Sequence, residues 1–195
     1  VYNGSGKVQG YNKQEVLKIT RSGNSVEAVV SGMQTDSKGK VQNTATVSLR
    51  YKNGNFHVNL LEMMPLQGLE NAEIDANMSG NDMIIPSKLS PGQILPDAEA
   101  TFKMRISDGS DAADLPPLVF HIYNRRAIRA ESVDTPIGKF VCFKIIQTIE
   151  ADYLLIGTQQ ATGITWIGKG IGVVKSETYD AKGKLTNRML LTGLE

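Results

Sequence analysis

Three features of this sequence carry residue types that could do chemistry: two histidines, one cysteine and one glycine-rich run. His57 and His121 each lie on the polar side of an alternating segment, and no HxH or HExxH spacing accompanies either of them. We interpret both as solvent-facing histidines of strands rather than as metal ligands or catalytic bases. The single cysteine, Cys142, excludes an internal disulfide and a thiolate metal cluster. Its apolar neighbours indicate a small buried hydrophobe rather than a reactive thiol.

The glycine-rich run GKGIG at residues 168–172 has the composition of a phosphate-binding loop. A dinucleotide-binding loop needs a glycine at the sixth position, where this chain has Val173, and a P-loop needs Ser or Thr after Gly-Lys. The residues that follow favour a strand rather than the helix that either loop requires. We therefore predict a bend within a strand, with the ring of Trp166 lying across the bare glycines. Neither a cofactor nor a metal is expected.

An envelope hydrolase that acts on glycans or peptides is an alternative function. The titratable residues that would have to converge for it are Glu62, Asp75, His57 and His121. Proton transfer needs hydrogen-bond reach, so this alternative requires these side chains to lie close together in the fold. No GxSxG nucleophile motif occurs, and the protein is expected not to be an enzyme.

The composition indicates a globular protein without a strongly charged surface. Hydrophobic residues make up 41% of the 195 residues and charged residues 21%, and 21 basic residues nearly balance 20 acidic ones. This balance and the low aromatic content of 6% exclude a general nucleic-acid surface. The densest basic spot, at Arg125, Arg126 and Arg129, is interpreted as a solvated edge. No run of 18 apolar residues occurs, so no transmembrane segment is expected.

Turns are the clearest signal of the elements that must position these residues. One pattern occurs at 3–8, 36–41 and 180–185: Asp or Asn, then Gly three residues later, then Lys and a branched hydrophobic residue. The Asp or Asn side chain accepts hydrogen bonds within its own turn, and Gly takes the left-handed conformation. Together with Asn53-Gly54, these segments predict hairpins.

Between the turns, apolar and polar residues alternate with a period of two. The pattern is clearest over 41–52 and 100–107, and it recurs over 26–30, 56–60 and 185–192. One apolar and one polar face are typical of an antiparallel sheet. We predict a mainly β fold in which about ten strands, joined mostly by hairpins, form a single large curved antiparallel sheet. Residues 1–195 form a single domain in this prediction.

Helical signals are weak, and prolines interrupt the middle of the chain. Residues 65–77 could form one or two helical turns, and residues 150–157 fit either a helix or a strand. The fold prediction therefore includes at most one or two short helices. Pro86, Pro91 and Pro96 remove ladder donors, so residues 83–98 are predicted to form an edge strand followed by a rigid crossover.

Three passages of the sequence resemble the signature of a protein family. They run from Trp166 to the turn at 180–185, over 85–98 (IPSKLSPGQILPDA) and over 135–142 (TPIGKFVC). They resemble TapB-like proteins, a family of uncharacterised exported bacterial proteins with a domain of unknown function. The resemblance implies export to the periplasm, or an outer-membrane-associated lipoprotein, of a Gram-negative bacterium. Because the chain begins at Val1 without a signal-peptide pattern, we expect either a removed N-terminus, which could have carried a lipid anchor, or a trimmed chain.

The resemblance also implies a half-barrel, similar to those of lipoprotein carriers and LppX-like lipid-binding proteins, which hold acyl chains in an apolar concavity. The expected function is therefore a non-enzymatic exported or cell-envelope protein that binds an apolar small molecule or lipid on the concave face of its sheet. The simpler interpretation is that these apolar residues only form the core, since a large antiparallel sheet must bury one face. An assembly scaffold that uses an exposed strand edge is a further alternative. The candidate lining residues are Phe102, Met104, Phe120, Ile122, Trp166 and Met189.

Overall fold

The structure is a computed structural model of the chain, and it is built from β-strands. It describes residues 1–60, 73–107, 112–114, 116–153 and 157–195, with the side chains at 73–78, 104–107, 112–114 and 153 left out. No helix occurs among the described residues. The strands are β1 (Tyr2–Asn3), β2 (Gly10–Ser22), β3 (Ser25–Asp36), β4 (Val41–Lys52), β5 (Asn55–Asn59), β6 (Glu73–Gly80), β7 (Asp82–Pro86), β8 (Ala98–Ser107), β9 (Ala112–Asp114), β10 (Leu118–Thr135), β11 (Gly138–Tyr153), β12 (Gly157–Gly168), β13 (Gly172–Asp180) and β14 (Leu185–Leu190).

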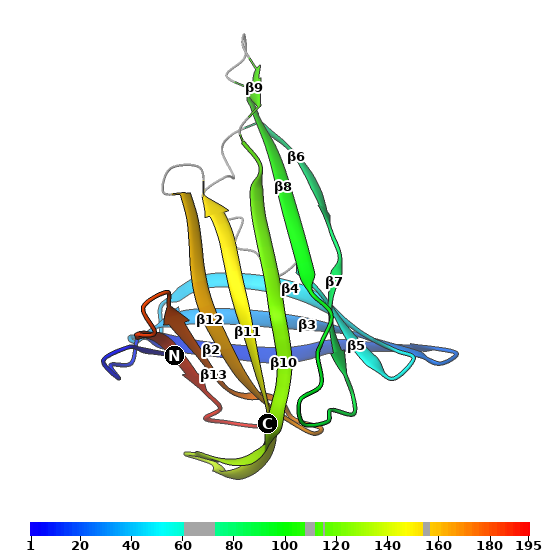
Figure 1. Cartoon of the computed structure of the whole chain (residues 1–195), viewed down its shortest axis with the longest axis vertical. Coiled ribbons are helices and arrows are strands. Elements are labelled where there is room, and N and C mark those ends of the chain that lie inside the picture. Colours follow the sequence, from blue (N-terminus) through cyan, green and yellow to red (C-terminus); the bar gives the residue numbers. More distant parts are fainter. Residues whose placement is uncertain (61–72, 108–111, 115, 154–156) are drawn as a thin grey trace.

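These strands form two antiparallel sheets that are not closed into a barrel (Figure 1). The larger sheet has nine strands in the order β1-β14-β13-β12-β11-β10-β8-β6, with β9 paired to β8, and the smaller has five in the order β2-β3-β4-β5-β7. The predicted mainly β, antiparallel fold is confirmed. The strands divide between two sheets, where the sequence pattern predicted one, because a strongly twisted sheet rarely exceeds about ten strands without curling or splitting.

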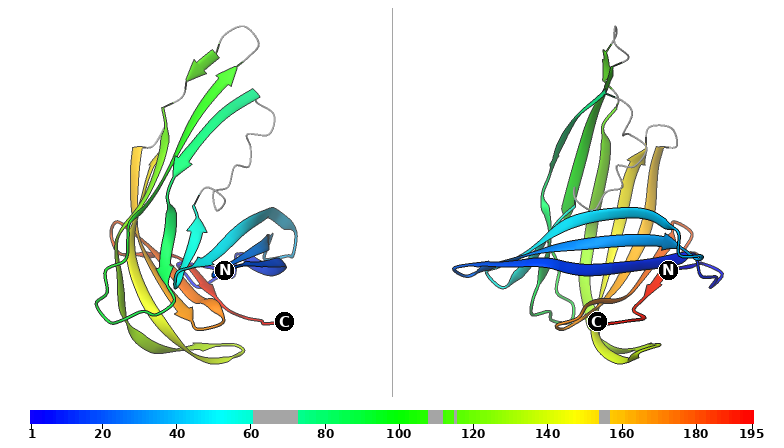
Figure 2. Two further views of the ribbon diagram at one scale, coloured as in Figure 1. Left: turned by 90° about the vertical axis from the view of Figure 1, so that its right-hand side faces the viewer. Right: turned by 180° about the vertical axis from the view of Figure 1, so that it is seen from behind.

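The two sheets join at both edges. At one edge, β6 of the larger sheet continues through Asn81 directly into β7 of the smaller sheet. The Asn81 side chain fixes this corner by accepting a hydrogen bond from the backbone N–H of Glu99 at 2.7 Å. At the other edge, Val8 bridges Tyr2 of β1 and leads into β2. As a result, the smaller sheet lies on the concave side of the larger one (Figure 2).

The three predicted Asp/Asn–Gly turns are confirmed as hairpins. In the last of them, Oδ1 of Asp180 accepts hydrogen bonds from the backbone N–H groups of Lys182 and Lys184, both at 2.9 Å, and Gly183 has a φ of 77°. The same pattern of two backbone donors repeats at Asn3 and Asp36. The predicted edge strand is also confirmed, since β7 ends at Pro86 and lies at the edge of the smaller sheet.

Other local predictions are wrong or fall outside the described residues. The GKGIG run is the turn between β12 and β13 rather than a bend in a strand, with φ of 74° at Gly170 and 94° at Gly172. The side chain closest to the bare face of Gly168 is that of Val174, not Trp166. Residues 65–72 of the suggested helix are not described, 73–77 belong to strand β6, and 150–153 are strand.

The basic spot on β10 is divided between the interior and the solvent. Asn124 adopts a φ of 53° at a register shift in β10, and Arg125, next to it, is only 1% exposed. The Arg125 guanidinium donates hydrogen bonds to the backbone carbonyls of Ile84 at 3.1 Å and Pro96 at 2.5 Å, so it links the two sheets. Burial lowers the pKa of Arg125 to about 10, which leaves it charged at neutral pH. The prediction of a solvated edge is therefore wrong for Arg125.

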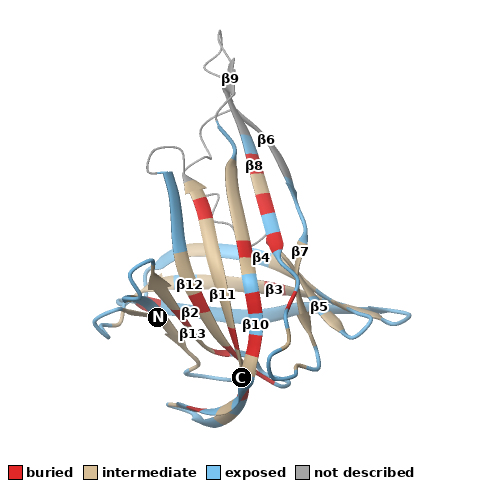
Figure 3. Ribbon diagram, in the orientation of Figure 1, coloured by how far each residue is buried: buried red, intermediate tan, exposed pale blue. Residues whose placement is uncertain are grey.

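Buried residues lie mainly on the strands of the larger sheet (Figure 3). One cluster on this sheet contains Ala98, Ala100, Phe102 and Ile122, and Leu60 joins it from the end of β5. A second cluster contains Val133, Cys142, Trp166 and Val174. Cys142 is 1% exposed, and burial raises the pKa of its thiol, which confirms the prediction of a buried small hydrophobe.

Candidate functional site

Three of the six candidate lining residues lie together in the first core cluster. Phe102 is 1% exposed, Ile122 is 5% exposed, and Phe120 packs against them. The strand register aligns Phe120 with Ala100 and Ile122 with Ala98, so their side chains share one face of the larger sheet. These residues form close-packed core.

The other three candidates lie elsewhere. Trp166 belongs to the second cluster, and its pairing with Lys144 places it on the opposite face of the larger sheet from the neighbouring Ile145. Met189 lines a small pocket of about 50 Å³ between β14 and the start of β2. The side chain of Met104 is not among those described. The predicted residues therefore do not form one common lining.

A second apolar surface belongs to the smaller sheet. The register aligns Val16 with Val30 and Val47, and Ile19 with Ala28 and Leu49, so these side chains share one face. This face, called here the inner face, meets the core cluster through Met83 and is turned toward the larger sheet. Its apolar residues are Val16, Ile19, Val26, Ala28, Val30, Val47, Leu49, Tyr51, Phe56, Val58, Met83 and Ile85.

Most of the inner face is only partly covered. Val30 is 6% exposed, but Val16 is 55%, Ile19 58% and Phe56 46% exposed, and the other apolar residues of this face are intermediate. Met83, which packs against the core cluster, lies at the β5–β7 edge, where the two sheets join. The covered part of the inner face is therefore at that corner, and the apolar face opens toward β2.

Trp166 anchors a different, polar site on the larger sheet. Its indole N–H donates a hydrogen bond to Oε1 of Glu131 at 2.6 Å, and Arg129 donates to Oε2 at 2.7 Å. These two hydrogen bonds, that from Trp166 foremost, lower the pKa of Glu131. The ammonium groups of Lys175 and Lys144, on the strands to either side, lie 4.3 and 5.2 Å from the centre of the tryptophan ring.

Glu177 is the buried carboxylate of this site, at 6% exposure. It accepts a hydrogen bond from Arg188 Nε at 2.8 Å and from the Tyr179 hydroxyl at 2.7 Å, and Lys175 Nζ lies 3.0 Å from it. Burial by itself would raise the pKa of Glu177, but the hydrogen bonds from Tyr179, Lys175 and Arg188 outweigh it and hold the pKa below its ordinary value. Glu177 is thus charged at neutral pH, and it neutralises one of two neighbouring cations.

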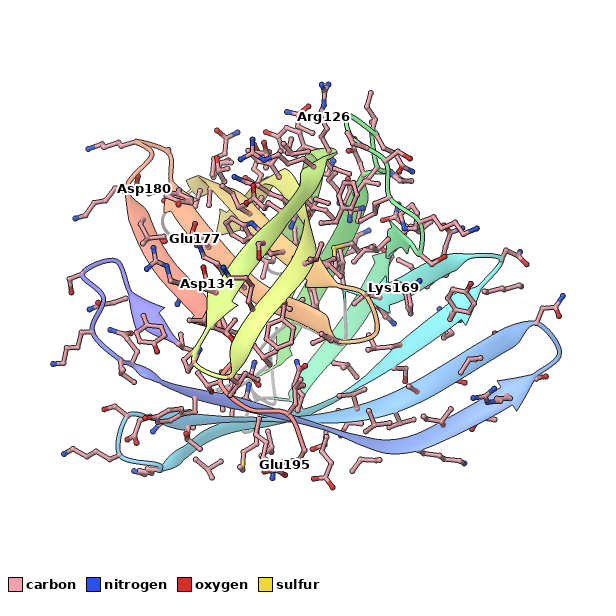
Figure 4. All side chains as sticks on the ribbon, turned by 90° about the horizontal axis from the view of Figure 1, so that it is seen from below. Arg126, Asp134, Lys169, Glu177, Asp180 and Glu195 are labelled. Carbon is pink, nitrogen blue, oxygen red and sulfur yellow. The ribbon has the colours of Figure 1, made fainter. Side chains whose placement is uncertain are left out.

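Glu131, Trp166, Lys175 and Arg188 border a pocket of about 300 Å³, called here the tryptophan pocket. Figure 4 views this end of the molecule from below and labels Asp134 and Glu177. Such a volume is at the lower end of the range for small-molecule sites, about 300–1,000 Å³. The lining residues are Glu131, Ser132, Val133, Asp134, Trp166, Lys175, Arg188 and Leu190.

The histidines lie apart from both surfaces. His57 is on the polar face of the smaller sheet, where its Nδ1 lies 3.5 Å from Asp82, and His121 stacks on Tyr123 of the larger sheet. Glu62 and the side chain of Asp75 are not described. Within the described part of the chain, no His, Cys, Asp and Glu side chains group as metal ligands would. The described residues also contain no helix that is long and apolar enough to span a membrane.

The tryptophan pocket was not predicted from the sequence. Glu131 and Asp134 come from β10, whereas Lys175 and Arg188 come from β13 and β14, two or more strands away in the sheet. Cross-strand pairs are set by register, which the sequence does not display. The available signal was the alternation of Lys175, Glu177 and Tyr179, which marks a polar stripe on one face of a strand.

Solved structures share this fold across nearly the whole chain. A protein proposed to be exported, with a YmcC-like fold, from Bacteroides fragilis is 23% identical, with a TM-score of 0.72 over 96% of this chain and 88% of its own. A protein proposed to be a lipoprotein from Parabacteroides distasonis is 20% identical, with a TM-score of 0.77 over 100% of this chain and 91% of its own. At these identities the likeness establishes the fold alone. Comparison with curated proteins gives no match.

The comparisons also test the family resemblance of the sequence. The specific resemblance to TapB-like proteins and to LppX-like lipid-binding proteins is not confirmed by them. The DUF3108-like family matches residues 1–191, which is almost the whole chain. The chain therefore belongs to the DUF3108-like family.

Proposed function

We propose that this protein is a non-enzymatic, exported protein that binds an acyl chain or a similar apolar ligand against the inner face of its smaller sheet. The observation that carries the proposal is the incompletely covered inner face, which is apolar at twelve aligned positions while Val30 alone among them is buried. Such exposure lowers the stability of a protein, and contiguous exposed apolar patches mark binding sites.

The shape and chemistry of the inner face suit an extended apolar chain. Side chains of adjacent strands lie about 5 Å apart in a sheet, so the aligned residues form rows that cross it. Tyr51 and Phe56 pack at 5.1 Å between ring centres within these rows. The inner face presents mainly β-branched and aromatic carbon, with Arg21 beside Val26 as a charged residue near the β2–β3 hairpin, and this favours acyl carbon over a polar ligand.

Export is supported by the related structures. The two described above are a protein proposed to be exported and a protein proposed to be a lipoprotein, both from Bacteroidetes. A location in the periplasm or at the outer membrane would place the inner face close to lipids.

The proposal is tested by titrating the protein with cis-parinaric acid, a fluorescent fatty acid. We expect saturable binding by the wild-type chain. Ile19→Lys and Phe56→Lys should each weaken it by about tenfold, because losing one buried apolar side chain costs about 1.5 kcal/mol or more. The matched control is Val141→Lys, which alters a 74% exposed valine on the larger sheet and should leave the affinity within about twofold of wild type.

Two results would refute the proposal. One is an absence of saturable binding by a folded wild-type chain, and the other is an equal loss of binding in Val141→Lys. Circular dichroism of each variant separates loss of binding from loss of the fold.

The alternative functions have weaker support. A hydrolase would need titratable groups that converge, but His57 and His121 belong to different sheets. An assembly role could use β2, which is the thirteen-residue edge strand of the smaller sheet. That edge carries two lysines, Lys13 and Lys18, and a register shift near Val16. The charges and the irregularity each disfavour edge-to-edge pairing.

A further inference from the structure

The tryptophan pocket has one acidic and one basic wall. The acidic wall is the end of β10, with Glu131 and Asp134, and the basic wall consists of Lys175 on β13 and Arg188 on β14. Trp166 also lines the pocket and is 4% exposed. The pocket is therefore lined by carboxylates on one side and by cationic side chains on the other.

The basic wall has binding capacity left over. Arg188 uses its Nε to reach Glu177, and its two terminal nitrogens have no partner among the described residues. Lys175 and Arg188 share the single charge of Glu177, so the wall keeps one excess positive charge. A guanidinium with free terminal N–H groups is suited to a carboxylate or phosphate.

The acidic wall has capacity as well. The Glu131 carboxylate accepts hydrogen bonds from Trp166 and Arg129, whereas a carboxylate offers about four acceptor positions. The ion-pair partners of the two carboxylates, Arg129 and Lys139, are 67% and 66% exposed, and neither they nor Lys144, whose charge also acts on Glu131, line the pocket. Ion pairs this exposed are weak, so both carboxylates can also hold an ammonium group.

We propose that the tryptophan pocket binds a small zwitterion, with its ammonium group at Glu131 and Asp134 and its carboxylate or phosphate group at Lys175 and Arg188. A free dipeptide and the head group of an ethanolamine phospholipid both carry this pair of charges. A ligand with one charge would satisfy one wall and leave the other unpaired, which is the physical basis of selectivity. The proposal is independent of acyl binding on the inner face.

The test uses Trp166, the single tryptophan, as a fluorescent reporter within the pocket. The wild-type chain is titrated at low salt with alanylalanine and with glycerophosphoethanolamine, and then with acetate and ethylammonium as single-charge probes. We expect at least one zwitterion to bind at least about tenfold more tightly than either single-charge probe. Binding of alanylalanine alone indicates a peptide-like ligand, and binding of glycerophosphoethanolamine alone indicates a lipid head group.

The variant that tests the mechanism is Glu131→Gln combined with Asp134→Asn. The Gln amide oxygen can still accept the hydrogen bond from Trp166, so the fold is preserved while the charge of the acidic wall is removed. Zwitterion affinity should fall by about tenfold, and acetate affinity should not fall. The control is Glu27→Gln, which neutralises an exposed carboxylate on β3. The proposal is overturned if neither zwitterion binds, if acetate binds as tightly, or if the double variant keeps wild-type affinity.

Discussion

Replacing Glu177 by Gln is the sharpest test of the polar site, because one buried carboxylate holds three partners. The substitution keeps the shape of the side chain and removes its charge. Lys175 and Arg188 then lose their shared counter-ion, although the Tyr179 hydroxyl can still donate to the amide oxygen. The expected effect is a loss of stability at neutral pH with little change in fold.

The size of the loss follows from the exposure of each partner. A hydrogen bond to a charged group contributes about 1.5–3 kcal/mol when buried, and an exposed ion pair about 0–1 kcal/mol. Lys175 is 24% and Arg188 41% exposed, so each pair falls between these limits. Removing both, with some relief from no longer burying a charge, should lower the free energy of unfolding by about 1.5–3 kcal/mol.

The pH dependence has a definite sign. The pKa of Glu177 is lower in the folded chain than its ordinary value of 4.5, so its contribution to stability is present above that pH and is lost as the pH falls through the folded-state pKa. The Gln variant lacks this titration. The stability difference between wild type and variant should therefore shrink in acid.

The assay is urea unfolding followed by the fluorescence of Trp166, at neutral pH and at several pH values below 4.5. Glu27→Gln, on an exposed strand position, is the control and should change the free energy of unfolding by less than about 0.5 kcal/mol. A Glu177→Gln variant as stable as this control, or one with the same acid sensitivity as wild type, would show that the network does not stabilise the fold.

Two further substitutions test the fold with the same unfolding assay. Arg125→Met removes the donor to the carbonyls of Ile84 and Pro96 and should lower the free energy of unfolding by about 2–4 kcal/mol, because these acceptors are left unpaired. The control is Arg126→Met at the exposed neighbour, which should lower it by less than about 0.5 kcal/mol. Gly183→Ala places a Cβ on a residue with a φ of 77° and should cost about 1–2 kcal/mol, and a neutral result would contradict the assigned turn.

Local features of the fold were predictable from sequence because their causes are local. Asp180 and Gly183 define their turn within a few residues, and the alternation over 41–52 reports a strand with one wet face. The division into two sheets was not predictable. It depends on where β6 leaves one sheet and enters another, and Asn81 at that corner carries no pattern that distinguishes it from an ordinary loop residue.

The candidate sites show the same limit. Alternation correctly marked Val30, Val47 and Leu49 as apolar-face residues, but it could not reveal that the larger sheet covers this face only in part. Trp166 was grouped with Phe102 because both are apolar, whereas register places them on opposite faces of the larger sheet. Arg125 entered the interior because the irregularity at Asn124 alters the regular alternation of β10.

The two joined edges have a mechanical consequence. Since β6 runs into β7 and the arm at Val8 runs into β2, neither sheet can slide or separate freely from the other. The distance between the two sheets can change only if the backbone bends at these corners. Asn81 stiffens one corner through its hydrogen bonds with the backbone of Glu99, whereas the opposite corner is held by the N-terminal hairpin. The flexibility of the backbone at these two corners therefore limits the size of the ligand that fits between the inner face and the larger sheet.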